Sequence, residues 1–286
     1  MKKHNTITRP SVDAKSQLRR LGTRAKKGLG QHFLVDQGVL KRIISAAELA
    51  PDDTVIEVGP GLGILTQELV KSAGRVIAVE VDHNLAESLQ SKLSNFPNLT
   101  VLKADILILN PSELVKNNHY KVVANLPYHI AAPILRHFLE ASLKPSLMVV
   151  MVQKEVAQSI VAGPGDMSIL GISVQLYGKP SIVDYVPAES FYPQPKVDSA
   201  IVRIDVYPAP AVDVTDIAGF FDIVKAGFST PRKQIRNSLA IGLDMPSAEV
   251  SDILKGAEID PRRRSETLSL EDWARLHLIY TDRSRA

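Results

Sequence analysis

The stretch Thr54-Val55-Ile56-Glu57-Val58-Gly59-Pro60-Gly61-Leu62-Gly63 decides the fold of this 286-residue chain. Its first half is a short β-rich run, and its second half is a turn containing three glycines. Glycines let a backbone turn tightly and approach a ligand where any Cβ would collide. Turns of this kind follow the first strand of nucleotide-binding sheets. The stretch therefore predicts a buried strand whose carboxyl end meets a bound ligand.

Similar β-rich runs recur along the chain, and segments with helical periodicity separate them. The first helical segment begins after Asp36, which is placed as its N-cap. This alternation indicates an α/β fold, in which an open parallel sheet is covered by helices on both faces. The expected parallel strands are 54–58, 75–80, 99–102, 121–124 and 147–152. Two later strands, 172–177 and 199–206, are expected to close the sheet as an antiparallel edge.

The C-terminal part of the chain has a different pattern. Pro208-Ala209-Pro210 is typical of a linker, and no strand pattern follows it. We therefore expect three parts: a basic, mobile arm over residues 1–25, an α/β domain over 26–207, and a small all-α domain over 208–286. Short helices are expected at 220–228, 232–241, 247–255 and 270–280.

The composition, with 45% hydrophobic and 23% charged residues, is that of an ordinary soluble globular protein. The chain has no cysteine, which excludes disulfides and thiolate metal sites and favours a reducing cytoplasm. No apolar core follows the first residues, so we expect no signal peptide. The longest apolar run, Leu147–Val152, is far too short to span a bilayer. We expect a cytoplasmic monomer without a metal or a membrane partner.

The net charge of +3 is unevenly distributed. Residues 1–42 contain eleven Lys and Arg against two Asp, a net charge of +9. Such an arm indicates a polyanionic partner, although a solubilising tail would have the same composition. The candidate contacts to RNA phosphates are Arg24, Lys26, Lys27, Arg232, Lys233, Arg236, Arg262, Arg263 and Arg264.

The glycine turn favours S-adenosyl-L-methionine over a dinucleotide. Gly59, Gly61 and Gly63 lack the G-x-G-x-x-G spacing that aims a helix N-terminus at a pyrophosphate, and Pro60 stiffens the turn. S-adenosyl-L-methionine has no phosphate to bind. Glu80, at the end of the second strand, is expected to accept both ribose hydroxyls. The cofactor's adenine amine is assigned to Asp105, which follows the third strand.

Asn125-Leu126-Pro127-Tyr128 ends the fourth expected strand. The Asn125 side-chain carbonyl and the Leu126 backbone carbonyl are both able to accept hydrogen bonds from one exocyclic NH2 group. The Tyr128 ring is able to stack on the base that carries this group. Transfer of a methyl group to the N6 of adenine requires such a pocket. Taken alone, the four residues are equally typical of an exit from a strand into a turn.

With these residues identified, the chain resembles the KsgA-type ribosomal RNA adenine dimethyltransferases from about Lys26 to the C-terminal region. The motifs that carry the resemblance are Gly30–Leu34, Glu57–Gly61, Asn125–Tyr128, Gln153–Ala157 and Phe191–Ala200. The resemblance implies a Rossmann-like methyltransferase sheet followed by a small helical domain. It also implies dimethylation of the N6 amines of two adjacent adenosines near the 3′ end of small-subunit rRNA. Cofactor contacts then fall on His32, Leu34, Gly59, Glu80, Asp105 and Asn125.

The implied partner is small-subunit rRNA or the assembling 30S subunit, and Tyr128 and Phe191 are expected to hold the flipped base between them. Phe191 is expected in a loop because three prolines lie nearby. Two other functions share this fold. One is a large-subunit rRNA adenine methyltransferase of the antibiotic-resistance type, and the other is a non-catalytic RNA-binding assembly factor. An NAD-dependent oxidoreductase fits less well, because the phosphate-binding turn is absent.

Overall fold

The computed structural model describes residues 14–116 and 119–285. They divide into two compact units. The sheet unit contains the described residues up to Ala157 together with Pro180–Val206. The helical unit contains Gln158–Lys179 and the residues from Tyr207 onward. The helical unit thus includes a stretch, 158–179, that lies before the linker in sequence.

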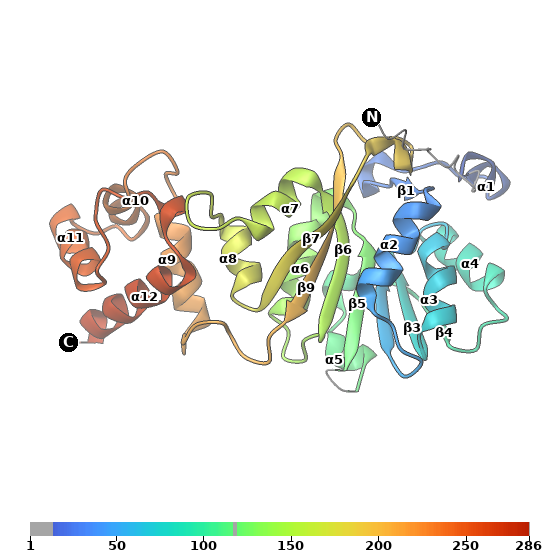
Figure 1. The fold of residues 1–286 in the computed structure, drawn as a ribbon, viewed down its shortest axis with the longest axis horizontal. Helices are drawn as coiled ribbons and strands as arrows, with labels where there is room; N and C mark the ends of the chain where they lie inside the picture. The colour runs from blue at the N-terminus through green and yellow to red at the C-terminus, as the bar shows by residue number, and fades with distance from the viewer. Residues whose placement is uncertain (1–13, 117–118, 286) are drawn as a thin grey trace, which may run out of the picture. The chain divides into compact units, whose positions relative to one another are not determined.

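Seven strands form the main sheet, in the order β4-β3-β2-β5-β6-β9-β7 (Figure 1). The strands from β2 to β6 pair in parallel, and β9 runs antiparallel to β6. The chain order therefore changes direction between β2 and β5, and open α/β sheets bind ligands at such a point. The strands are β2 (Thr54–Val58), β3 (Arg75–Glu80), β4 (Leu99–Lys103), β5 (Tyr120–Asn125), β6 (Leu147–Gln153), β7 (Gly178–Val186) and β9 (Ser199–Val206).

The expected parallel α/β sheet is confirmed, as is the strand over 199–206. Asp36 caps helix α2 as predicted, because its Oδ1 accepts hydrogen bonds from the N–H groups of Gly38 at 2.7 Å and Val39 at 3.2 Å. Helix α2 packs its buried side chains against β5, β6 and β9. The helices between the strands are α2 (Gln37–Ala47), α3 (Ile64–Ser72), α4 (His83–Lys92), α5 (Pro111–Leu114), α6 (Ala131–Leu139) and α7 (Lys154–Val161).

The predicted strand over 172–177 is wrong, because helix α8 (Ile169–Gln175) occupies most of this segment. Ser168 caps the helix by accepting from the Gly171 N–H at 2.9 Å. Residues 171–174 are all buried, so the helix shows no exposed face in its sequence. A short helix buried on every side and a buried strand have the same apolar pattern. The edge strand beside β9 is instead β7.

Two elements near the N-terminus were not expected. Helix α1 (Ala14–Arg20) lies within the segment predicted to lack structure, and it buries Ala14 and Leu18 in the hydrophobic core. One pair of apolar residues four positions apart is too short a pattern to show periodicity. Strands β1 (Phe33–Leu34) and β8 (Phe191–Tyr192) form a separate two-stranded antiparallel sheet. Residues 1–13 of the expected arm lie outside the described residues.

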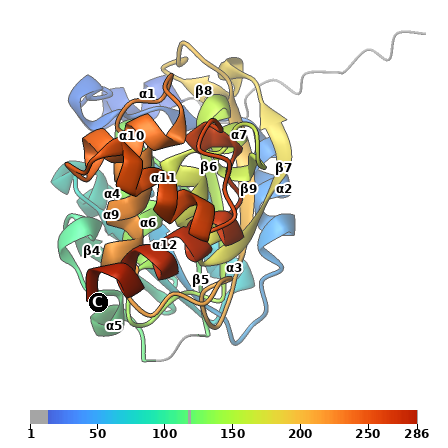
Figure 2. The ribbon, with the colours of Figure 1, turned by 90° about the vertical axis from the view of Figure 1, so that its left-hand side faces the viewer.

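Four C-terminal helices form the body of the helical unit, as predicted (Figure 2). Trp273 is fully buried at its centre and stacks on Phe228, with ring centroids 5.7 Å apart. The helices are α9 (Ile217–Gly227), α10 (Ile235–Gly242), α11 (Ser247–Gly256) and α12 (Leu270–Arg285). None of the helices in the described part of the chain combines the length and the apolar character needed to cross a membrane.

Candidate cofactor and substrate site

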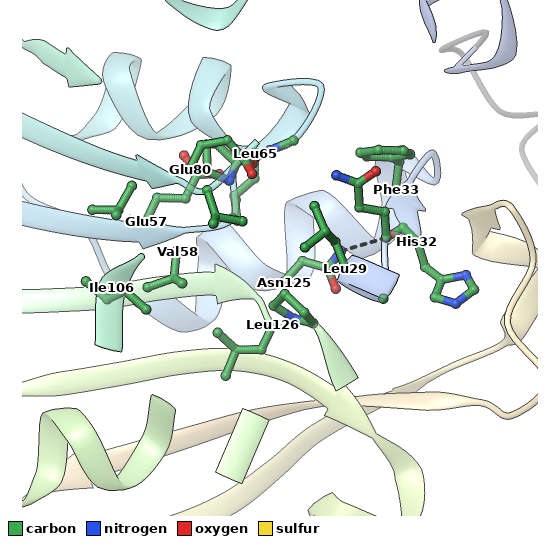
Figure 3. Close-up of a pocket in the computed structure, with 18 of the residues that line it drawn as sticks. Leu29, His32, Phe33, Glu57, Val58, Leu65, Glu80, Ile106, Asn125 and Leu126 are labelled. Atoms are coloured by element: carbon green, nitrogen blue, oxygen red, sulfur yellow. Dashed lines mark hydrogen bonds between the residues drawn. The ribbon is translucent and has the colours of Figure 1, made fainter. Parts of the chain in front are cut away.

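A cavity lies at the carboxyl ends of β2, β3, β4 and β5, within the sheet unit (Figure 3). Residues 29–34 form its remaining wall. Seven of the eight residues that were predicted to bind the cofactor line this cavity, and Gly63 is the one that is not among its lining residues. Its lining consists of residues 29–34, 57–62, Ile64, Leu65, 79–81, 104–106, 125–128 and Ile130.

The glycine turn has the backbone conformation that its sequence predicts. Gly59, Gly61 and Gly63 have φ angles of 66°, 56° and 77°, a region that residues with a side chain rarely adopt. A Cβ at Gly61 would also lie 2.9 Å from the Phe33 ring. The turn therefore needs glycine at position 61 for both its conformation and its space.

Glu80 is buried at the end of β3, and both of its oxygens accept backbone hydrogen bonds. The Gly61 N–H donates to Oε2 at 3.0 Å, and the Asp82 N–H donates to Oε1 at 2.9 Å. Burial raises the pKa of Glu80, and these two donors partly oppose the rise. The carboxylate is thereby fixed beside the glycine turn, where it keeps lone pairs for hydroxyl donors. Asp105 caps the 3₁₀ turn η2 (Ile106–Ile108) after β4 and lines the cavity next to Ile106.

Glu57 was not identified as a site residue from the sequence. It lines the cavity from β2 and is only 1% exposed. Burial, with a small contribution from the Glu80 charge, raises the pKa of Glu57 to about 8, although the nearby Thr66 hydroxyl opposes the rise. Among the described residues, neither Glu57 Oε2 nor Thr66 Oγ1 has a hydrogen-bond partner of normal geometry. A buried polar atom without a partner is uncommon in folded proteins, and this one lies in a residue of the cavity wall.

Glu57 should make stability depend on pH. An unfolded glutamate titrates near pH 4.5 and the folded Glu57 near 8, so the folded state holds an extra proton between these values. The free energy of unfolding should therefore fall as pH rises through this window, by on the order of a few kcal/mol. Glu57→Gln should remove this decrease. Urea unfolding of the cofactor-free proteins at about pH 5 and about pH 9 measures it. If the free energy of unfolding falls equally between these two pH values in the wild type and in the variant, the titration belongs to another group.

Asn125 ends β5 on the other side of the cavity. Its Nδ2 donates a hydrogen bond to the His32 carbonyl at 3.0 Å, which determines the orientation of the amide (Figure 3). The Oδ1 atom must then be the opposite atom of the amide, and no described donor bonds to it. Leu126 follows with its N–H bonded to the Met151 carbonyl at 3.1 Å, which fixes the backbone just before Pro127. The segment thus places the Asn125 Oδ1 acceptor next to a backbone turn that a hydrogen bond fixes in position.

Tyr128 is held on two sides. Its hydroxyl shares a 2.6 Å hydrogen bond with Ser199 Oγ, and its ring stacks on the His32 ring with centroids 5.5 Å apart. His32 Nδ1 in turn lies 2.6 Å from the Pro193 carbonyl. Burial raises the pKa of Tyr128, so the hydroxyl stays protonated at neutral pH. The ring is thereby held at the cavity wall.

Phe191 does not take the position expected from the sequence. It belongs to strand β8 rather than to a loop, pairs with Leu34 of β1, and is only 4% exposed. Its side chain lies in the hydrophobic core and does not line the cavity. The loop position expected for Phe191 is therefore wrong, whereas its stacking on a base opposite Tyr128 stays a prediction. The β1–β8 pairing accounts for the difference, and two-residue strands leave no detectable pattern in a sequence.

Comparison with known proteins identifies the family. The profile of the family described as "Ribosomal RNA adenine dimethylase" matches residues 22–281. The chain belongs to the ribosomal RNA adenine dimethylase family.

Relatives support this placement over most of the chain. The "Ribosomal RNA small subunit methyltransferase A" of Dehalococcoides mccartyi (strain ATCC BAA-2266) is 52% identical over 272 residues, which cover 95% of this chain and 94% of the relative. The protein of the same name from Enterococcus faecalis is 43% identical over 286 residues, covering 96% of this chain and 97% of that protein.

Solved structures with the same fold include two that act as useful comparisons. The 23S rRNA methyltransferase ErmE has a TM-score of 0.68 and 31% identity, covering 86% of this chain and 98% of that one. A dimethyladenosine transferase from Plasmodium falciparum has a TM-score of 0.75 and 26% identity, covering 88% and 98%.

Adenine dimethylases of this family use S-adenosyl-L-methionine, and the cavity fits this cofactor. Positive φ at the three glycines lets the backbone approach closely, and Glu80 and Asp105 offer acceptors to hydroxyl and amine groups. Apolar side chains such as Phe33 and Ile106 suit the flat purine.

The basic residues predicted to contact RNA differ in their surroundings in this family member. Lys26, Arg262, Arg263 and Arg264 each have a carboxylate within 4.0 Å, namely Asp82, Asp260, Asp272 and Glu266. Arg263 also donates hydrogen bonds to Thr267, which makes it a structural residue of the helical unit. Arg236 is half-buried. Of the nine predicted residues, the exposed ones that have no ion pair within the described part of the chain are Arg24, Lys27, Arg232 and Lys233.

Proposed function

We propose that this protein dimethylates the N6 amines of two adjacent adenosines near the 3′ end of small-subunit (16S) rRNA, using S-adenosyl-L-methionine. One observation carries the proposal. Asn125 donates its Nδ2 to the His32 carbonyl, so its Oδ1 is oriented as an acceptor in the cavity that suits the cofactor. The curated relatives named as small-subunit methyltransferases support this choice of RNA.

The N6 lone pair of adenine is delocalised into the ring, which makes the amine a poor nucleophile. Hydrogen bonds from the NH2 group to Asn125 Oδ1 and to the Leu126 carbonyl would favour a pyramidal nitrogen. Its lone pair then points out of the ring plane. Holding a reactant in such a geometry supplies several kcal/mol of the rate enhancement.

When bound, S-adenosyl-L-methionine supplies an electrophilic methyl group on a sulfonium. The residues of the chain hold the two reactants and need no strong base, because the N6 proton leaves after positive charge has developed on the nitrogen. The Asn125 Oδ1 dipole stabilises that charge. Tyr128, fixed by Ser199 and His32, offers its ring to one face of the flipped base, and such stacking is typically worth about 1–3 kcal/mol.

We infer that the RNA is bound through exposed cations, with the helical domain (208–286) as one binding region. Replacing both Arg232 and Lys233 with glutamine should weaken RNA binding and lower the salt slope of log K by roughly 1.5, because two phosphate contacts are lost. Filter binding at several salt concentrations measures the slope. Arg262→Gln is the matched control, since Arg262 is already paired with Asp260 at 3.1 Å and should change the slope less. A slope equal to that of the wild type in the double variant would contradict this assignment.

Mass spectrometry of rRNA after incubation with protein and cofactor tests the function. We expect two adjacent N6,N6-dimethyladenosines in small-subunit rRNA and none in large-subunit rRNA. Methylation of large-subunit rRNA alone would instead favour an activity like that of ErmE. Absence of cofactor binding would favour a non-catalytic assembly factor. We also propose a cytoplasmic, monomeric enzyme whose partner is the assembling 30S subunit.

A further inference from the structure

Asp82 is a buried carboxylate at the edge of the cavity that the proposed reaction does not use. Its side chain is only 3% exposed, and it lies at the N-terminus of α4. Its Oδ2 is 2.9 Å from Lys26 Nζ and accepts from Gln31 Nε2 at 3.3 Å. Its Oδ1 accepts from the Asn84 N–H at 3.2 Å, which caps the helix. A buried carboxylate with two side-chain donors from one distant segment joins two parts of the chain.

These donors come from residues 26–34, here called the wall segment, whose second half lines the cavity. Lys26 and Gln31 are also joined to each other, because the Lys26 N–H donates to Gln31 Oε1 at 2.9 Å. The far end of the wall segment is held separately, by Asn125 at the His32 carbonyl and by Pro193 at the His32 ring. Between Lys26 and Gln31 the chain forms the short 3₁₀ turn η1 (Lys27–Leu29) and a left-handed Gly30. Asp82 therefore holds both ends of this turn, while Ala25 just before it packs against the core.

We infer that Asp82, Lys26 and Gln31 form a latch that holds the wall segment against the cofactor cavity, so that Lys26 positions the cofactor site rather than contacting RNA. This inference rests on the proposed use of the cavity for S-adenosyl-L-methionine. The three residues are positioning residues, since they act through the wall segment. Lys26 was predicted from the sequence as a phosphate contact, but in the structure its Nζ lies 2.9 Å from the buried Asp82 carboxylate.

Two further observations support the latch. The Asp82 backbone N–H donates to Glu80 Oε1, so the turn that holds the latch also fixes the acceptor assigned to the ribose. Burial raises the pKa of Asp82, but the hydrogen bonds from Lys26 and Gln31 and the Lys26 charge outweigh it and leave the pKa below its usual value. The latch is therefore an ion pair at neutral pH.

Asp82→Asn and Lys26→Met test the latch. Asparagine caps helices as well as aspartate, so Asp82→Asn removes the ion pair and leaves α4 capped. Each variant should raise the dissociation constant of S-adenosyl-L-methionine roughly three- to tenfold, as expected for a partly exposed charged pair. Hydrogen exchange of the backbone amides of residues 26–31, measured without cofactor, should become faster. The double variant should be no worse than the weaker-binding single variant, and Lys26→Arg should restore most of the affinity.

Glu87→Gln is the matched control, because Glu87 lies on the same helix and pairs with Lys103 at 2.6 Å outside the cavity lining. It should leave both cofactor binding and exchange unchanged. The latch is refuted if the Asp82 and Lys26 variants behave like this control. It is also refuted if Lys26→Met weakens RNA binding while cofactor binding and exchange stay normal. A wild-type protein that does not bind S-adenosyl-L-methionine would refute the proposed function and the latch together, whereas unchanged variants of a binding wild type refute the latch alone.

Discussion

Asn125→Ala should lower the rate of methyl transfer by about 100- to 1000-fold, the loss typical of removing one oriented group that stabilises a transition state. The affinity for RNA should change little, because Asn125 contacts one base whereas phosphate contacts supply most of the binding. Single-turnover methylation with saturating cofactor, together with filter binding of the same RNA, measures both quantities. Equal losses in rate and in RNA affinity would argue that Asn125 serves binding rather than reaction.

Two further variants separate the roles of this amide. Asn125→Asp keeps an acceptor but loses the donor to the His32 carbonyl at 3.0 Å, and it brings two oxygens together there. It should therefore also be slow, with weaker cofactor binding because the wall segment loses an attachment. Asn98→Ala is the structural control. Asn98 Nδ2 donates to the carbonyls of Val70 and Ala73, both at 2.9 Å, so its loss should lower stability while the methylation rate is kept.

The sheet was predictable because parallel strands are buried on both faces and appear as continuous apolar runs. The runs at 54–58 and 75–80 match β2 and β3 residue for residue. The same rule failed at α8, where a helix buried on all sides leaves the same pattern. Strand β7 was missed because Pro180 and alternating exposed residues interrupt its apolar character. Strands β1 and β8 are two residues each, below the length at which any periodicity exists.

The cavity-lining residues were predictable where strand ends determine their place. Glu80, Asp105 and Asn125 follow successive strands, so the topology alone brings them to one edge. Glu57 was missed because its burial depends on the elements packed around it, and the sequence shows only an acidic residue in a strand. The partner of Lys26 could not be predicted either, since Asp82 is distant in sequence and a lysine in a basic arm is usually solvated. Phe191 was expected in a loop because its strand partner, Leu34, belongs to a segment that is remote in sequence.

Gly61→Ala should nearly abolish cofactor binding. The new Cβ would lie 2.9 Å from the Phe33 ring, and alanine at a φ of +56° is strained. Phe33 is 7% exposed in the core and lines the cavity, so the ring cannot move without displacing either the core or the space for the ligand. We expect the dissociation constant of S-adenosyl-L-methionine to rise at least about 100-fold. Overpacking between the turn and Phe33 should cost about 3 kcal/mol of binding free energy, which corresponds to this change. Isothermal titration calorimetry measures it.

Gly22→Ala separates the two causes of this effect. Gly22 has almost the same φ, +61°, but a Cβ there meets nothing within 4 Å. It should therefore lose only the conformational term, about 1 kcal/mol of stability, and bind the cofactor normally. If Gly61→Ala loses the same stability as Gly22→Ala and also binds normally, the approach of the turn to Phe33 does not shape the site. A loss of binding confined to Gly61→Ala would instead attribute it to the space between the turn and Phe33, because both variants carry the same backbone strain.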